Sequence, residues 1–181
     1  MQFKRYRLME LCGAILCLAG VWLLSNLYEL TNRNAVGIIF GSVNGSVWES
    51  LKPVMLTYFA YGGLELLSAK PYFRAFVVAK SFGLCFVMAL YLGLRCFMSS
   101  IIVSPFLALA PGFAFSYILM KKELSDFFAL GCFLLLTVFM MYFCFTANPP
   151  GLEIFRDPMT GLYGIIPQDF DRGAVFLSAV F

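Results

Sequence analysis

Long apolar runs separated by short polar clusters are the main pattern along this chain. Five runs are about 20 residues long, which is the length of an α-helix that crosses the hydrocarbon core of a membrane. The pattern therefore predicts an all-α integral membrane bundle over residues 1–145. The predicted spans cover residues 8–28, 46–69, 75–96, 101–120 and 125–145.

Two segments do not fit this pattern of spans. Residues 35–43, AVGIIFGSV, are apolar but too short to cross a membrane, so we expect an interfacial or re-entrant half-helix. Residues 146–181 are rich in Pro, Gly and Asp, which predicts an irregular structured segment outside the membrane. The apolar stretch at residues 174–181 could lie back on the membrane surface.

The composition supports a membrane location. Hydrophobic residues make up 61% of the 181-residue chain and charged residues only 13%, against roughly 25% charged residues in soluble domains. The net charge of +3 is spread along the chain, whereas a nucleic-acid-binding protein gathers positive charge on one face. We therefore expect the lipid bilayer, and no nucleic acid, as a partner.

The residue types that commonly bind metals are scarce. The chain has no histidine, the commonest zinc ligand and proton shuttle. Its six cysteines show no CxxC spacing and lie in or beside apolar runs, which is typical of small buried side chains. We expect no metal and no cofactor. Cys96 and Cys144 would lie near the same face, so a disulfide between them stays open.

Positive charges gather at alternate ends of the predicted spans. Cytoplasmic loops of membrane proteins retain Lys and Arg, so this bias predicts orientation. It predicts a multi-pass protein of the cell membrane with its N-terminus in the cytoplasm and its C-terminal segment outside. The basic residues on the cytoplasmic side would be Lys4, Arg5, Arg7, Lys70, Arg74, Lys121 and Lys122.

The stretch at residues 44–52, NGSVWESLK, is unusually polar for this chain. Ser46 with Glu49 three residues later forms a capping box, which predicts that a helix begins here. In one interpretation Trp48 anchors this helix at the membrane interface, while the Lys52 side chain extends to water. In the other, the stretch contributes to a ligand site at the outer rim of the bundle.

Three segments resemble a family of small bacterial membrane proteins of unknown function. They are LYE at residues 27–29, NGSVWESLK at residues 44–52, and FTANPPGLEIFRDPMTGLYGI at residues 145–165. The resemblance extends over nearly the whole chain. Members of that family often carry a histidine at the position of Ser50 and another near Asn26. This chain has neither, which argues against any metal or acid–base role that those histidines would serve.

All three segments would lie at the outer membrane face, which favours a pocket between the spans. The alternative is that the C-terminal segment only packs on the loop between the first two spans, because buried polar groups in membranes can be functional or structural. The candidate ligand-binding residues are Tyr28, Glu29, Asn44, Trp48, Glu49, Lys52, Asn148, Asp157 and Tyr163.

The sequence leaves three functions open. The first is a protein of binding or transport type for a small ligand or lipid, which at this size could form a homo-oligomer. The second is a membrane enzyme that uses Glu29, Glu49 or Asp157 as a general acid or base. The third is an accessory protein that binds the membrane helices of a partner.

Two charged residues are expected to pair inside the bundle. Glu65 lies five residues before Lys70 and Lys80 six residues after Arg74. At 1.5 Å per residue, both would lie about 7 to 9 Å inside the cytoplasmic end of adjacent antiparallel helices. A lone charge at that depth is costly, so we predict a Glu65–Lys80 ion pair. It could be structural, or its carboxylate could relay protons.

Overall fold

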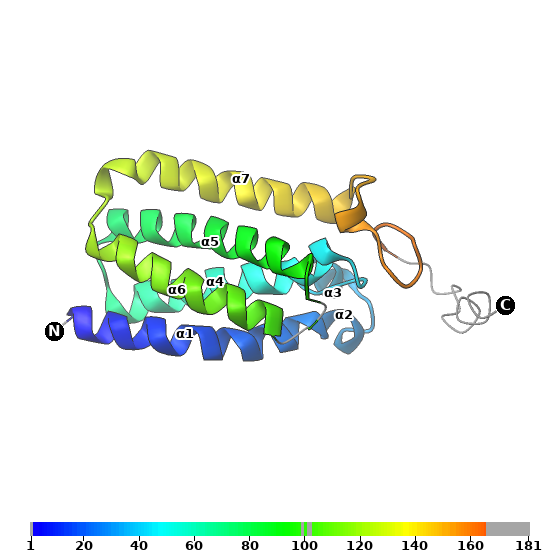
Figure 1. The fold of residues 1–181 in the computed structure, drawn as a ribbon, viewed down its shortest axis with the longest axis horizontal. Coiled ribbons are helices and arrows are strands. Elements are labelled where there is room, and N and C mark those ends of the chain that lie inside the picture. The colour runs from blue at the N-terminus through cyan, green and yellow to red at the C-terminus, as the bar shows by residue number, and fades with distance from the viewer. Residues whose placement is uncertain (1, 99, 101–102, 166–181) are drawn as a thin grey trace.

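The described part of the chain folds into helices joined by short loops (Figure 1). The computed structural model describes residues 2–98, 100 and 103–165, so the apolar stretch at 174–181 lies outside the described residues. The all-α prediction is confirmed over this part. Its helices are α1 (Gln2–Ser25), α2 (Leu27–Leu30), α3 (Ala35–Phe40), α4 (Val47–Ala69), α5 (Phe73–Arg95), α6 (Val103–Lys121), η1 (Ser125–Phe127), α7 (Phe128–Ala147) and η2 (Glu153–Phe155).

Helix α4 begins where the capping box predicts. Ser46 is its N-cap, and the Ser46 hydroxyl accepts a hydrogen bond of 3.2 Å from the backbone N–H of Glu49. This bond satisfies one of the amides that lack a partner within the first turn. The helix ends at Ala69, because Lys70 adopts a left-handed conformation with φ of 46°.

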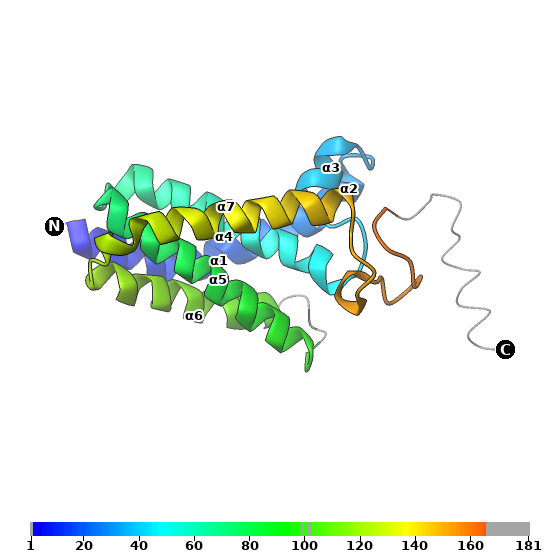
Figure 2. The same cartoon turned by 90° about the horizontal axis from the view of Figure 1, so that it is seen from above.

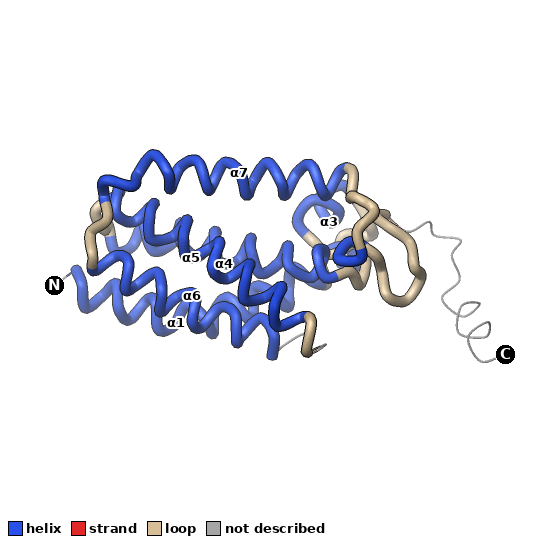
Figure 3. Tube along the Cα trace, turned by 45° about the horizontal axis from the view of Figure 1, so that its top comes forward, coloured by secondary structure: helices blue, strands red, loops and turns tan. Residues whose placement is uncertain are grey.

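Four long helices form a ring, and a fifth lies outside it. Helix α1 contacts α4 and α6, while α5 contacts the same two helices from the opposite side. Helix α7 packs mainly on the outside of α5, as Figures 2 and 3 show. The short helices α2 and α3 and residues 148–165 lie together at one end of the bundle, the right-hand end in Figure 1. We call this the distal end.

Helix α4 is more buried than α7, although α7 is the more apolar of the two. The helices long and apolar enough to cross a membrane are Leu8–Ser25, Phe73–Arg95, Val103–Lys121 and Ser125–Ala147, four within the described residues. Helix α4 is equally long but carries Glu49, Lys52 and Glu65, and it is not one of these four. Yet thirteen α4 residues are buried, against three in α7.

The helices of the structure begin and end within a few residues of most predicted boundaries, and two differences have a clear local cause or size. The first predicted span, residues 8–28, is interrupted at Asn26, where α1 has ended and the one-turn helix α2 follows. The Asn26 amide donates a 2.7 Å hydrogen bond to the carbonyl of Trp22, and such local side-chain bonding competes with a continuous helix. Residues 35–43, predicted as a half-helix, contain the short helix α3, which ends earlier than predicted, at Phe40.

Candidate functional site

Two groups of buried polar side chains stand out, and the first lies at the distal end. Its members come from the polar stretch before and within α4 and from the segment after α7. We call it the distal cluster, which consists of the buried Ser46, Glu49, Lys52 and Asp157 and the half-buried Asn44.

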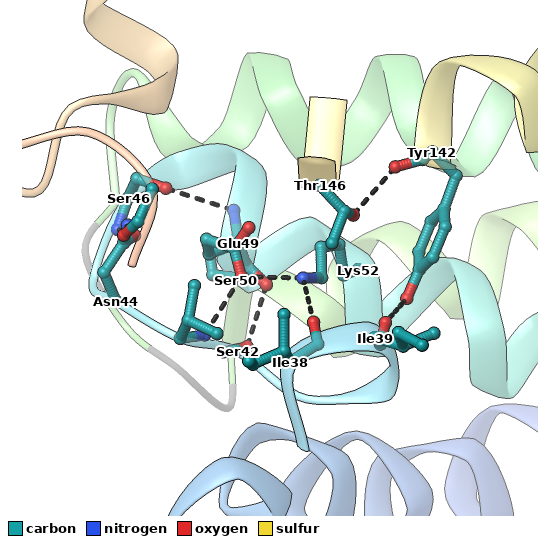
Figure 4. Close-up of polar contacts among 12 residues, drawn as sticks. Ile38, Ile39, Ser42, Asn44, Ser46, Glu49, Ser50, Lys52, Tyr142 and Thr146 are labelled. Atoms are coloured by element: carbon teal, nitrogen blue, oxygen red, sulfur yellow. Dashed lines mark hydrogen bonds and ion pairs between the residues drawn. The ribbon is translucent and has the colours of Figure 1, made fainter. Parts of the chain in front are cut away.

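Glu49 and Lys52 tie the short helix α3 to α4. The Lys52 ammonium lies 2.9 Å from a Glu49 carboxylate oxygen and donates a 3.1 Å hydrogen bond to the Ile38 carbonyl (Figure 4). The same Glu49 oxygen accepts a 3.0 Å bond from the backbone N–H of Val43. Since the last carbonyls of a helix lack partners within it, Lys52 completes the C-terminal end of α3.

A second helix contributes to the same end of α3. The hydroxyl of Tyr142, on α7, donates a hydrogen bond to the Ile39 carbonyl (Figure 4). The Tyr142 side chain is buried, and its ring lies 5.9 Å from the Lys52 ammonium. Sequence reasoning did not single out Tyr142, because its bonding partner is a backbone carbonyl 103 positions away in the chain.

Asp157 joins the C-terminal segment to the start of α4. One carboxylate oxygen accepts a 2.9 Å hydrogen bond from the backbone N–H of Gly45, and the other accepts bonds of 3.0 Å and 2.6 Å from the N–H and hydroxyl of Thr160. The Asn44 amide donates a 2.8 Å bond to the Gly164 carbonyl. Both carboxylate oxygens of Asp157 therefore have donors from the protein itself.

Trp48 and Lys52 are buried, so the interpretation in which they reach the membrane surface is wrong. Trp48 is 3% exposed and its ring lies 5.1 Å from that of Phe145 and 5.2 Å from that of Phe155. Within the described residues its indole N–H has no hydrogen-bond partner. The causes differ: Phe145 of α7 and Phe155 of η2 pack on the Trp48 ring, whereas Lys52 lies between α3 and Tyr142 of α7.

The remaining candidates do not join the distal cluster. Tyr28 is buried beneath the Arg33 guanidinium, and Glu29 is exposed and pairs with Arg33 at 3.2 Å. Asn148 is exposed at the C-cap of α7, and Tyr163, 40% exposed, forms a backbone bridge to Arg156. Cys96 and Cys144 are both free thiols, so the disulfide left open by the sequence is not present.

The second group lies inside the four-helix ring. Lys80 of α5 lies 2.9 Å from a carboxylate oxygen of Glu10 on α1 and is also paired with Glu65 of α4. All three side chains are buried, with exposed fractions of 7%, 5% and 0%. We call Glu10, Glu65 and Lys80 the interior triad. Ser116 of α6 adds a 2.7 Å hydrogen bond to the same Glu10 oxygen, so four helices meet here.

Aromatic rings enclose the ammonium of the triad. The Lys80 nitrogen lies 4.8 Å from the centre of the Phe113 ring and 5.2 Å from that of Tyr58. Aromatic faces attract cations, more strongly where water is excluded. The Tyr61 hydroxyl donates a 2.7 Å bond to the carbonyl of Met9, next to Glu10. The triad is therefore closed off by rings from α4 and α6.

The triad contains the pair predicted from depth and one residue that the prediction missed. Glu65 and Lys80 meet as expected, and Glu10 joins them. The signal for Glu10 was the same depth rule: it lies three residues after Arg7, as Ser116 lies five residues before Lys121. Applied to α1 and α6, that rule gives depths of about 5 and 8 Å, near the depth of about 9 Å for Lys80, but it does not say which face of either helix turns inward.

Charge balance distinguishes the two groups. In the distal cluster Glu49 is matched by Lys52, and Asp157 by backbone and hydroxyl donors. In the triad, two carboxylates face one ammonium. Among the described residues no group of three or more His, Cys, Asp or Glu side chains could hold a metal ion.

An apolar groove lies beside the triad. It is a cavity of about 220 Å³ between α4, α5 and α7, and the Lys80 side chain forms part of its wall. We call it the α4–α5–α7 groove. Its other lining residues include Phe59, Gly63 and Leu66 of α4, Phe73 and Phe76 of α5, and Leu135 of α7.

The fold and the site define a helical bundle with four helices that could cross a membrane and a buried acid–base triad at its centre. The chain belongs to a family described as "Family of unknown function (DUF6512)", whose model matches residues 3–165. The family resemblance inferred from the three sequence segments is thus confirmed as membership of a family of unknown function. Neither a curated protein nor a solved structure matches the chain.

Proposed function

We propose that this chain is a multi-pass membrane protein of binding or transport type in which the interior triad takes up and releases a proton. The observation that carries this proposal is the burial of three ionisable groups in mutual contact, where the Lys80 ammonium pairs with the carboxylates of both Glu10 and Glu65. Ionisable residues inside membrane bundles are costly and commonly mark ion or proton pathways.

The distribution of apolar residues supports the membrane placement. Helix α7 exposes large apolar side chains such as Phe133, Leu136 and Met140, while the more polar α4 is buried. Lipid solvates apolar surface, so an apolar outside and a polar inside suit a bilayer. In this proposal α4 is a fifth span, α3 a re-entrant half-helix, and the N-terminus cytoplasmic by the Lys and Arg bias.

The distal cluster is less suited to bind a ligand or to act in catalysis. Its carboxylates, Glu49 and Asp157, already accept hydrogen bonds from the protein, and Lys52 is held between Glu49 and the Ile38 carbonyl. A general acid or base needs a free position near its substrate. We therefore assign the distal cluster a structural role and move the proposed working site to the triad.

Proton uptake follows from the local energetics. With both carboxylates ionised, the triad holds two negative charges around one ammonium in a water-poor interior, where the two carboxylates repel each other. A proton on either carboxyl leaves one ion pair and one neutral hydrogen-bond donor. Because the groups interact strongly, the proton belongs to the triad as a unit. The other titratable groups facing it are Cys17 of α1 and Tyr58 and Tyr61 of α4.

Infrared spectroscopy of the purified protein tests this proposal. We expect a carbonyl stretching band of a protonated carboxylic acid at neutral pH that disappears in alkaline solution. Glu10→Gln and Glu65→Gln should each abolish or shift it, since each leaves one carboxylate for one ammonium. The exposed Glu153→Gln is the control and should leave the band unchanged. Absence of the band at every pH at which the protein stays folded would contradict proton exchange.

A further inference from the structure

Two adjacent glycines open the α4–α5–α7 groove. A Cβ added at Gly63 would meet nothing within 4 Å, and one at Gly62 would meet the Lys80 side chain at ordinary contact distances of 3.7 and 3.8 Å. Neither glycine is therefore needed for the close approach of another helix. Glycine weakens a helix relative to alanine. Because these two positions carry no side chain, an apolar space stays open on the side of the bundle.

The groove offers hydrocarbon surface. Its walls are aromatic and aliphatic side chains, and Lys80 contributes its methylene stem while its ammonium is bound by Glu10 and Glu65. From Lys80 the groove reaches Leu66, in the last turn of α4, and Phe73, the first residue of α5. It therefore extends from the level of the triad to the turn that joins α4 and α5.

Positive charge lies at that end of the groove. Lys70 and Arg74 are exposed and flank the α4–α5 turn. At this end of the bundle, the α4–α5 and α6–α7 connections carry more positive than negative residues. The first turns of α1 are not included in this comparison. The charged residues there are Lys70, Arg74, Lys121, Lys122, Glu123 and Asp126. An apolar slot that ends at basic side chains is complementary to an amphiphile with a negatively charged head.

We propose that the α4–α5–α7 groove binds one acyl chain of an anionic phospholipid whose phosphate lies at Lys70 and Arg74. The acyl chain occupies the space beside Gly62 and Gly63. The phosphate accepts hydrogen bonds from the Lys70 ammonium and the Arg74 guanidinium. This assignment rests on the proposed function only for the placement in a membrane. It adds a lipid site to the proton site and does not depend on proton exchange.

Native mass spectrometry of the detergent-purified protein tests this site. Phosphatidylglycerol and phosphatidylcholine with identical acyl chains are offered together, and the bound lipids are counted. We expect the unmodified chain to retain phosphatidylglycerol preferentially. Gly63→Leu should reduce retention of both lipids because its side chain fills the groove. The matched control is Gly93→Leu on α5, where an added Cβ also meets nothing within 4 Å and the residue does not line the groove.

A second variant tests the head-group position. Lys70→Gln with Arg74→Gln alters only exposed side chains, so the bundle should fold normally. It should reduce the preference for phosphatidylglycerol by about fivefold for each charge removed. Equal lipid retention by the Gly63→Leu and Gly93→Leu variants would overturn the assignment of the acyl chain to the groove. An unchanged preference for phosphatidylglycerol in the double variant would overturn the head-group assignment. Displacement of the lipid by inorganic phosphate would likewise overturn a site held by the acyl chain.

The lipid site and the proton site can fail separately. Lipid retention is read from mass spectra, whereas proton exchange is read from the infrared carbonyl band. A Gly63→Leu variant that loses lipid and keeps the band supports the lipid site independently. If the unmodified protein shows the infrared carbonyl band but retains neither lipid, the lipid site is overturned and the proton site is not.

Discussion

The distal cluster and the interior triad are both buried and ionic, yet they differ in how their charges are matched. In the distal cluster Glu49 pairs with Lys52 and Asp157 accepts bonds from Gly45 and Thr160, and these bonds join α3, α4 and the segment after α7. The triad joins α1, α4 and α5, and its single ammonium contacts two carboxylates. The difference lies in how many carboxylates one buried cation contacts, which burial alone does not reveal.

The two groups also differ in how the chain assembles them. Glu49 and Lys52 lie on successive turns of one helix, so a short motif brings them together. Glu10 and Lys80 are 70 positions apart and meet only when three helices pack. The comparison predicts that a change in the triad will disturb both stability and proton binding, whereas a change in the distal cluster will disturb stability alone.

The largest effect is expected from Lys80→Met. It removes the ammonium that contacts both carboxylates, and breaking a buried ion pair in this way costs about 3–5 kcal/mol. Combining Lys80→Met with Glu65→Gln removes one of the two carboxylates and should recover part of the loss. The measurement is the free energy of unfolding in detergent for both single variants and the double variant. Strictly additive losses would contradict the contact between Glu65 and Lys80.

A smaller effect is expected from Asp157→Ala. The substitution removes the acceptors for the Gly45 amide and for Thr160, and losing hydrogen bonds to a charged group costs about 1.5–3 kcal/mol. Stability in detergent should fall, while the infrared carbonyl band of the triad should stay unchanged. Glu153→Gln, an exposed change in the same segment, is the control. Loss of the band in Asp157→Ala would remove the distinction between the two groups.

The smallest effect is expected from Ser46→Ala. Its hydroxyl caps α4 through a single bond to the Glu49 amide, and replacing such a cap by alanine costs about 0.5–2 kcal/mol. Thermal unfolding followed by circular dichroism measures this loss. The control is Glu29→Gln, which breaks an exposed pair with Arg33 worth about 0–1 kcal/mol. A Ser46→Ala variant as stable as its parent would show that the cap is dispensable.

The sequence could predict features that depend on neighbours in the chain or on depth along a helix. The start of α4 at Ser46 and the meeting of Glu65 with Lys80 are of this kind. The sequence could not predict that Glu10 completes the triad. Helix α1 is apolar on nearly all sides, so its pattern does not indicate which face turns inward.

The errors at the distal end have a different origin. Trp48 and Lys52 look like residues that reach a membrane surface, because their types and their place at a helix start are typical of such anchors. The burial of Trp48 involves Phe155, 107 positions further along the chain, and Lys52 lies against Ile38 of α3 and Tyr142 of α7, which is 90 positions away. A short sequence pattern does not indicate contacts between residues so far apart in the chain.

The bond between Gly45 and Asp157 also constrains the order in which the molecule can be built. These residues are 112 positions apart, so the start of α4 is synthesised long before the carboxylate that joins it. Contacts between distant positions require the closure of a large loop and form slowly. The ring of helices can therefore assemble first, while the bonds of Asn44 to Gly164 and of Gly45 to Asp157 wait for residues 157–164. A ribosome that pauses before residue 155 would leave the Trp48 ring without its contact to Phe155, and with it an apolar surface that chaperones or quality-control proteases recognise.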